Sequence, residues 1–170
     1  MKGLSLPDLF HIGWVVRDCR AAEERMIREL GAGPFRTIGP EARFEHALVH
    51  GAPTPFALRI SFGVLGNLIV ELLEPLDDRS PHAEFLAEHG EGLHHLAYLV
   101  TDFDRQLAAA GAATPPMERL IDGTGPGNPV RWVYLQAEAA PGAVIELLER
   151  SDTAEAAFGP VLELLDRNRA

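Results

Sequence analysis

Two stretches of the chain share one pattern and divide the sequence into comparable halves. HIGWVVRD at 11–18 and HLAYLVTD at 95–102 each begin with His, end with Asp and hold mainly apolar residues between. Each is followed by a segment with apolar residues at helical spacing and then by three further strand candidates. Self-similarity of this kind predicts two copies of one supersecondary unit. We therefore expect an α+β fold in which two βαβββ modules form a curled mixed sheet.

Gly, Pro and polar turn residues set the boundaries of the expected elements. In the first half these are a strand over 9–16, a helix over 20–30 and strands over 43–50, 56–64 and 67–73. A helical connector over 81–89 leads to a strand over 93–100, a helix over 102–110 and strands over 117–121, 130–137 and 143–148. We predict one domain over residues 1–170, with modules at about 8–76 and 92–150 and a C-terminal helix over 153–168.

Four polar residues lie in the middle of apolar strand segments: His11, Glu71, His95 and Glu146. Side chains alternate between the two faces of a strand, and a His or Glu on a buried face is unfavourable unless it is paired or bound to a metal. Taken singly, each could be a hydrogen-bonded core histidine or a solvent-facing Glu. Each half has one such His in its first strand and one such Glu in its last strand, so we interpret the four as the ligands of one divalent metal ion.

Charge and cysteine content exclude several classes of partner. Fifteen basic and twenty-five acidic side chains give a formal charge of -10, which disfavours nucleic acid and anionic membrane surfaces. Cys19 is the single cysteine, so no intrachain disulfide is possible. No segment resembles a signal peptide or a membrane span. We expect a cytoplasmic protein that acts on a small molecule, without nucleic acid or membrane partners.

Three segments resemble the vicinal-oxygen-chelate superfamily, which includes glyoxalases, bleomycin-resistance proteins and extradiol dioxygenases. They are VELLEPL at 70–76, GLHHLAYLVTDFD at 92–104 and VIELLER at 144–150. Within the superfamily the chain is most similar to methylmalonyl-CoA epimerase and glyoxalase I, over about residues 9–150. The resemblance implies paired βαβββ modules around a metal whose ligands come from the first and last strand of each module. The residues at those positions are His11, Glu71, His95 and Glu146.

The resemblance also implies the chemistry of the site. Two His and two Glu suit a Lewis-acid ion such as Co, Ni, Zn, Mn or Mg, which polarises a carbonyl group. We therefore expect a metal-dependent isomerase or lyase, epimerase-like or glyoxalase-like, that abstracts a proton next to a carbonyl through an enolate intermediate. The implied substrate is a 2-oxo compound or an acyl thioester, and the implied assembly is a homodimer.

Proton abstraction needs a base within reach of the carbon acid. Glu146 is our candidate, because a carboxylate that loosens from a metal can accept a proton. The epimerase pattern also needs a second catalytic Glu on a strand of the first half, but ALRISFGV at 57–64 holds no acid. Glu45 is the substitute candidate for that role.

Two other functions stay open at this point. One is a ring-cleaving dioxygenase with ferrous iron on His11, His95 and Glu146, since such enzymes use two His and one carboxylate. The other is a resistance-type protein that binds a small molecule without turnover, for which the metal is dispensable. The four-residue set favours the isomerase or lyase.

Other polar residues are assigned from strand alternation and local context. Alternation places His94 on the face opposite to His95, in a structural role. The remaining histidines are expected in solvent: His46, His50, His82 and His89. Candidates for the cavity wall are Arg59, Ser61, Arg131 and Tyr134. The DGTGPGNP segment at 122–129 lacks the Lys of a phosphate-binding loop, so we expect a turn or lid.

Overall fold

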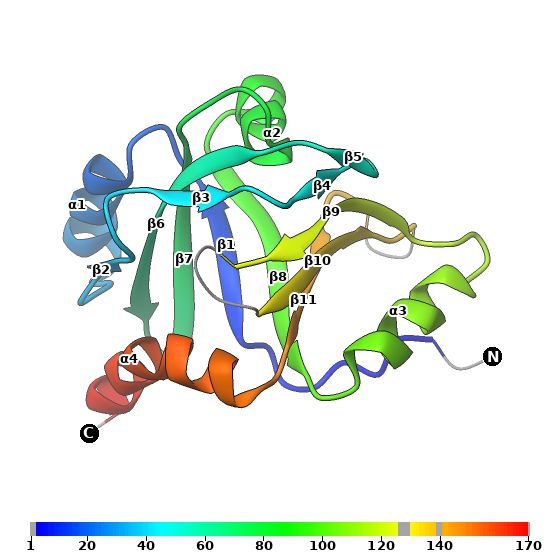
Figure 1. Ribbon diagram of the computed structural model, residues 1–170. Helices are drawn as coiled ribbons and strands as arrows, with labels where there is room; N and C mark the ends of the chain where they lie inside the picture. Colours follow the sequence, from blue (N-terminus) through cyan, green and yellow to red (C-terminus); the bar gives the residue numbers. More distant parts are fainter. Residues whose placement is uncertain (1–2, 126–129, 139–140, 170) are drawn as a thin grey trace.

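The computed structural model describes residues 3–125, 130–138 and 141–169. Within these ranges, eleven strands form one mixed sheet that curls around an interior without closing, and helices lie along its outside and its ends (Figure 1). This architecture confirms the expected α+β fold with a curled mixed sheet.

The elements follow the predicted alternation of strands and helices, with additional short strands in the first half. In chain order they are β1 (His11–Val15), α1 (Cys19–Leu30), β2 (Arg36–Thr37), β3 (Ala42–Phe44), β4 (Leu48–Val49), β5 (Ala52–Pro53), β6 (Phe56–Leu65), β7 (Leu68–Pro75), α2 (Pro81–His89), β8 (Gly92–Val100), α3 (Phe103–Gly111), β9 (Glu118–Thr124), β10 (Arg131–Gln136), β11 (Val144–Glu149) and α4 (Asp152–Arg169).

The first strands of the two halves, β1 and β8, are antiparallel neighbours at the centre of the sheet. Each pairs in parallel with the last strand of its own half, β1 with β7 and β8 with β11. The antiparallel strands β6 and β10 follow on either side. The four strands that carry the predicted metal ligands are therefore contiguous.

Helix α1 illustrates how local sequence signals fix the outer layer. The Asp18 side chain accepts a hydrogen bond from the Ala21 backbone N–H at 2.9 Å, and the helix ends at Gly31 with φ 65°. The helix packs on β6 and β7, with Cys19 buried against this face of the sheet. Burial and the nearby Glu74 carboxylate raise the pKa of Cys19 to about 12, so the thiol stays protonated.

The predicted strand over 43–50 is wrong as a single element. A turn at Glu45 and His46 divides it into β3 and β4. Strand β3 pairs with β6 of the first half, whereas β4 pairs with β9 of the second half. The chain therefore crosses between the two sides of the curled sheet here, and this long-range pairing is invisible to a local pattern.

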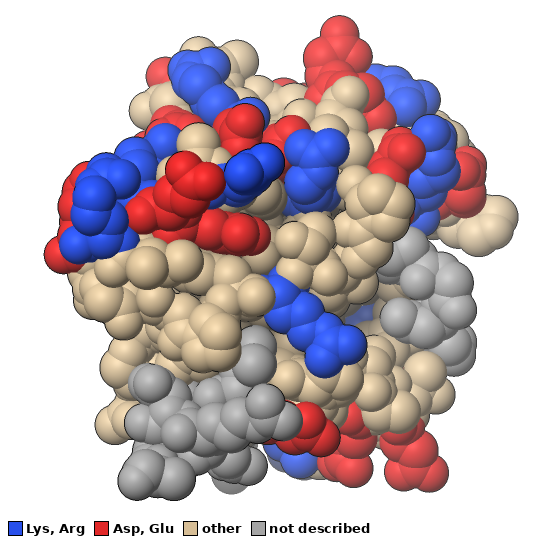
Figure 2. Space-filling view, turned by 90° about the vertical axis from the view of Figure 1, so that its left-hand side faces the viewer, with Lys and Arg blue, Asp and Glu red and all other residues tan. Residues whose placement is uncertain are grey.

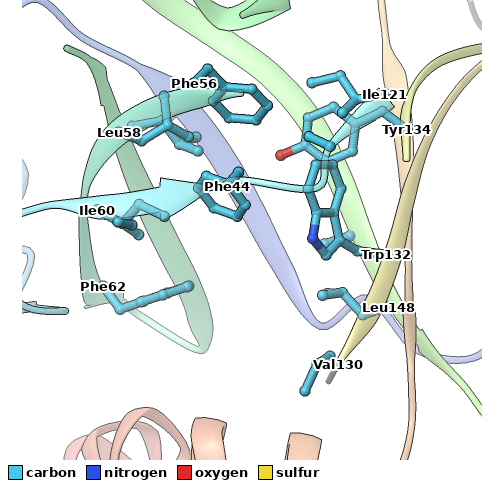
Figure 3. Close-up of a cluster of buried hydrophobic side chains, with 14 of the residues drawn as sticks. Phe44, Phe56, Leu58, Ile60, Phe62, Ile121, Val130, Trp132, Tyr134 and Leu148 are labelled. Carbon is cyan, nitrogen blue, oxygen red and sulfur yellow. The ribbon is translucent and has the colours of Figure 1, made fainter. Parts of the chain in front are cut away.

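Aromatic and aliphatic side chains from both sides of the sheet meet in the interior (Figure 3). Helix α4 crosses one end of the sheet (Figure 1). Its Phe158 ring lies 5.1 Å from Phe10 and 6.1 Å from Phe62, and Val161 is buried in the same core. These apolar residues of the last helix therefore serve the core of this chain. Residues 126–129 of the predicted turn or lid lie outside the described residues.

Charged side chains are interspersed on the face that carries α1 (Figure 2). Arg20 pairs with Glu24, Arg28 pairs with Glu29, and Arg25 reaches Glu91 across the surface. Acidic and basic groups thus alternate on this face. In the part of the chain that the structure describes, no helix combines the length and apolarity needed to cross a membrane.

Candidate metal centre

The structure brings His11, Glu71, His95 and Glu146 together in the interior. The two Nε2 atoms of His11 and His95 lie 3.2 Å apart. Glu71 Oε2 lies 3.2 Å from each of them, and Glu146 Oε2 lies 3.1 Å from His11 Nε2 and 3.3 Å from His95 Nε2. All four residues are buried. Residues from four strands thus direct one nitrogen or oxygen atom each toward a common point.

Small residues opposite each histidine make room for this arrangement. In the β1–β8 pairing His11 faces Ala97, and His95 faces Gly13. A Cβ atom on Gly13 would lie 2.0 Å from Cε1 of the His95 ring, so only glycine fits there. The small residue two positions after each His is a signal that our sequence reading did not use.

The four atoms fit a divalent metal ion. Five of the six distances between them are 3.1–3.3 Å, close to the edges of a tetrahedron whose centre lies about 2.0 Å from each corner, the length of Zn–N and Zn–O bonds. Among the described residues no hydrogen-bond donor serves the buried Glu146 Oε2, although the two Nε2 atoms lie close to it. Buried carboxylate oxygens normally have partners, so this oxygen is suited to a cation.

The electrostatics of the cluster show that its two carboxylates need positive charge. Burial by itself lowers the pKa of His11, but the carboxylates of Glu71 and Glu146 outweigh burial and raise that pKa to about 9. Burial would raise the pKa of Glu71, but His11 and His95 outweigh it and hold that pKa well below its usual range. In the metal-free protein a proton on His11 therefore supplies part of the charge that a metal ion would bring.

The prediction that His94 faces away from His95 is wrong. Gly13 pairs with His95 and Trp14 with Leu93, so His94 is the extra residue of a β-bulge in β8. A bulge interrupts the strict alternation of side chains, and His94 turns inward with its Nδ1 3.2 Å from Nδ1 of His95. If His95 binds a metal through Nε2, its Nδ1–H can donate to His94, which fixes the tautomer and the ring orientation.

The expectation that His82 is solvated is also wrong. His82 is 1% exposed, because α2 packs across the end of β7 and β8 and directs it inward. Its Nε2 lies 3.2 Å from the Tyr134 hydroxyl, and its ring lies 5.0 Å from that of His94. Burial, followed by His95, lowers the pKa of His82 to about 3, so this ring is neutral near pH 7. Burial and the carboxylates of Glu146 and Glu71 raise the pKa of Tyr134 well above its usual value.

A cavity of about 150 Å³ lies against the metal cluster. Glu71 and Glu146 lie on its wall, and His82 and Tyr134 add two further polar groups. The rest of the described wall is almost entirely apolar and includes Phe158. Figure 3 shows seven more of these residues: Phe44, Phe56, Leu58, Ile60, Phe62, Trp132 and Leu148. This is the usual composition of a small-molecule site, with a few polar groups in an apolar enclosure.

Tyr134 is the one of four proposed wall residues that lines this cavity. Arg59 is held on the outer side by Glu74, and Arg131 pairs with Asp104 and lies over the Phe103 ring. Ser61 is buried on the face of β6 that alternation places away from the cavity. Glu45 lies in the exposed turn between β3 and β4 and does not line the cavity. The solvent exposure expected for three histidines agrees with the structure: His46, His50 and His89.

Comparison with known proteins identifies the family. A family model described as Glyoxalase/Bleomycin resistance protein/Dioxygenase superfamily matches residues 10–130, which is more than half of the chain. The chain therefore belongs to this superfamily, and the resemblance noted from the sequence is confirmed.

Individual relatives extend the comparison. The chain is 29% identical over 145 residues to the Ethylmalonyl-CoA/methylmalonyl-CoA epimerase of Cereibacter sphaeroides, covering 82% of this chain and 95% of that protein. It is 29% identical over 92 residues to the uncharacterized protein YqjC of Bacillus subtilis, covering 54% of this chain and 65% of that protein, just under two thirds of its length. A variant of Streptomyces coelicolor methylmalonyl-CoA epimerase in complex with 2-nitronate-propionyl-CoA superposes with a TM-score of 0.63 at 24% identity, covering 88% of this chain and 98% of that one. At this identity the last similarity shows the fold alone.

Proposed function

We propose that this protein is a metal-dependent enzyme of the isomerase or lyase type that moves a proton at a carbon next to a carbonyl group. The observation that carries the proposal is the convergence of His11, Glu71, His95 and Glu146 against the wall of an apolar cavity. The similarity to an acyl-CoA epimerase over most of the chain supports the same reaction class.

The four residues would hold one divalent ion, such as Co, Ni, Zn, Mn or Mg. When bound, such an ion supplies Lewis-acid polarisation of a carbonyl oxygen. Glu146 is the proposed base: its carboxylate takes the proton from the carbon, and the electron pair of the broken C–H bond moves toward the carbonyl to give an enolate. Return of the proton from Glu146 to the carbon restores the carbonyl compound. The proton returns to the same face of the enolate, or to the other face if the substrate has turned in the cavity.

The cavity supports a reaction with one base. The β6 residues on the cavity wall cannot transfer protons: Phe56, Leu58, Ile60 and Phe62. Glu45 is exposed and lies off the cavity wall, so we do not propose it as a second base. The proposed reaction is therefore proton exchange or isomerisation through a single carboxylate, rather than transfer between two acids.

We propose an acyl thioester as the substrate class, because the Cereibacter sphaeroides relative is an acyl-CoA epimerase. Small 2-oxo compounds are the alternative, since they present the same carbonyl to the metal. A homodimer and a cytoplasmic setting remain predictions from the resemblance and from the single cysteine.

The test combines metal content with proton exchange. Wild-type protein reconstituted with each divalent ion is incubated with methylmalonyl-CoA in deuterated buffer, and deuterium uptake at the carbon acid is followed by mass spectrometry against a protein-free blank. We expect one metal per chain and catalysed exchange, with exchange lost in Glu146→Gln and unchanged in the exposed-site control His89→Ala. Stoichiometric metal without exchange of any acyl-CoA or 2-oxo compound would refute the enzymatic reaction.

A binding protein without turnover is the second candidate. Strand β6 contributes only apolar side chains to the described cavity wall and no acid, which favours this candidate. It predicts tight binding of a small molecule and no exchange in the same experiment. The ferrous dioxygenase is disfavoured, because Glu71 adds a fourth protein ligand to the two His and one carboxylate typical of such iron sites.

A further inference from the structure

The cavity wall contains a buried hydrogen-bond donor that has no partner. Trp132 is 6% exposed, and no described residue accepts a hydrogen bond from its Nε1–H. An indole nitrogen can only donate, and burying an unsatisfied N–H is unfavourable. The second polar group on the same strand face is satisfied, since the Tyr134 hydroxyl lies 3.2 Å from His82 Nε2.

The indole nitrogen faces the interior space rather than the sheet (Figure 3). The Phe44 ring packs edge to face with the Trp132 ring, with ring centroids 5.5 Å apart, and offers at most a weak π acceptor. A ligand in the cavity is therefore the group that can satisfy this donor.

The position of Trp132 on β10 fixes where the acceptor must lie. Tyr134 pairs with Glu146 and Trp132 pairs with Leu148, so Trp132 is one inward-facing position farther from the metal cluster. Two residues along a strand span about 6.6 Å. A ligand whose head meets the metal residues would thus present its acceptor roughly 6–7 Å beyond that head.

The charge of the wall excludes an anionic acceptor. No Lys or Arg is present among the described residues that line the cavity, whereas Glu71 and Glu146 are. A second anion in this enclosure would be repelled and desolvated without a counter-charge. The cavity of about 150 Å³ also has the size of an engineered protein cavity that binds benzene.

We propose that Trp132 is a specificity-determining residue that selects ligands with two features. The ligand has an oxygen-bearing head at the metal residues, and a ring-sized uncharged body whose ether, carbonyl or hydroxyl oxygen accepts a hydrogen bond from Trp132 Nε1–H. This proposal rests on the metal centre proposed above and narrows the proposed acyl thioester or 2-oxo substrates to those whose acyl or oxo part carries such a body.

Two hydroxamates of matched size test the proposal on the Zn²⁺-loaded protein. 4-Methoxybenzohydroxamate and 4-ethylbenzohydroxamate share the metal-binding head and differ by one oxygen in place of one CH₂ group. We expect the methoxy compound to bind the wild type roughly threefold to tenfold more tightly by calorimetry, the range for one net hydrogen bond. In Trp132→Phe this preference should disappear, while the ethyl compound still binds.

The two tryptophans of the chain provide a second measurement that needs no variant. Trp14 lies on β1 and packs in the outer cluster with Val70 and Leu72, so it serves as an internal control. In protein labelled with ¹⁵N at the indoles, the methoxy compound should shift the Trp132 N–H resonance downfield relative to the ethyl compound, and the Trp14 resonance should stay in place.

The outcomes separate failure of this inference from failure of the proposed function. If both hydroxamates bind with equal affinity and the Trp132 resonance does not distinguish them, the role of Trp132 is overturned and the metal centre stands. If neither hydroxamate binds the Zn²⁺-loaded protein, or the protein holds no Zn²⁺, the metal centre and the inference that rests on it both fail.

Discussion

The first strands of the two modules position their histidines in the same way, but different contacts support the two rings. His11 on β1 lies opposite Ala97, and His95 on β8 lies opposite Gly13, so each imidazole packs over a small residue of the other strand. The supporting contacts then diverge. His95 Nδ1 lies 3.2 Å from His94 Nδ1, whereas no described residue contacts His11 Nδ1 through a hydrogen bond.

Ring packing supports His11, whereas a polar contact supports His95. The His11 ring lies 5.1 Å from Phe10 and 5.6 Å from Phe62, in edge-to-face arrangements. The β8 bulge that supplies His94 has no counterpart in the described register of β1 with β7. A duplicated module can therefore keep its ligands while changing the contacts that orient them, and the five experiments below probe this difference.

Removal of either histidine should have the largest effect. In His11→Ala and in His95→Ala we expect metal affinity to fall more than about 100-fold, beyond the range for loss of an outer partner. The two losses should be similar, because each ring supplies one Nε2 atom to the same point. Competition with a chelator of known affinity measures both, with His89→Ala as the exposed control. Full metal binding by either variant would contradict the four-ligand centre.

Substitution of Gly13 should act through His95 alone. In Gly13→Ala the new Cβ atom would overlap the His95 ring, which is fully buried, and would displace it. We expect a loss of metal affinity approaching that of His95→Ala. The matched change Ala97→Gly opens space beside His11 and should leave metal affinity nearly intact. Equal effects of the two changes would show that the strand backbones, not the ring contacts, set the site.

Loss of the His94 acceptor should have an intermediate effect that the first module does not share. In His94→Phe the His95 Nδ1–H has no acceptor, and we expect metal affinity to fall about 10- to 100-fold. His94→Asn keeps a hydrogen-bonding oxygen and should recover part of this loss. Phe62→Leu, which changes the packing beside His11 without removing a polar contact, is the comparison for the first module. A purely structural role of His94 would lower stability in both His94 variants without this difference in affinity.

The pH dependence of metal affinity should reflect the titration of His11. Its pKa is raised to about 9, above the value of about 6.5 in an unfolded chain, so below pH 9 the metal-free protein carries a proton on this ring. A metal must displace that proton, so affinity should rise about tenfold per pH unit up to pH 9 and then level off. Calorimetry in buffers of different ionisation enthalpy should detect about one released proton at pH 7.

The same group gives a stability test on the metal-free protein. Because the folded pKa of His11 is the higher one, its contribution to stability is fully present below about pH 6.5 and declines as the pH rises toward 9. Denaturant unfolding of wild type and His11→Gln across this range should therefore converge as the pH increases. A constant difference between the two proteins would mean that His11 is not protonated in the metal-free state.

Much of the fold and of the candidate centre could be predicted from local pattern. Apart from the segment over 43–50 and the additional short strands of the first half, the order of strands and helices was correct, and the structure brings the four candidate ligands, singled out by strand alternation and the repeat, to one point. Alternation is a property of each strand by itself, so it holds wherever the pairing is regular. It failed at His94, where an extra residue in β8 interrupts the pairing with β1.

The chain by itself determined which residues occupy the first and last strand of each module, because those strands are buried and their polar residues stand out. Only the tertiary structure decided which other groups join them. Helix α2 turns His82 into the interior, the β4–β9 pairing carries the chain across to the second module, and the position of Trp132 leaves its N–H facing the cavity. Each of these depends on contacts between segments distant in sequence, and short-range periodicity carries no information about such contacts.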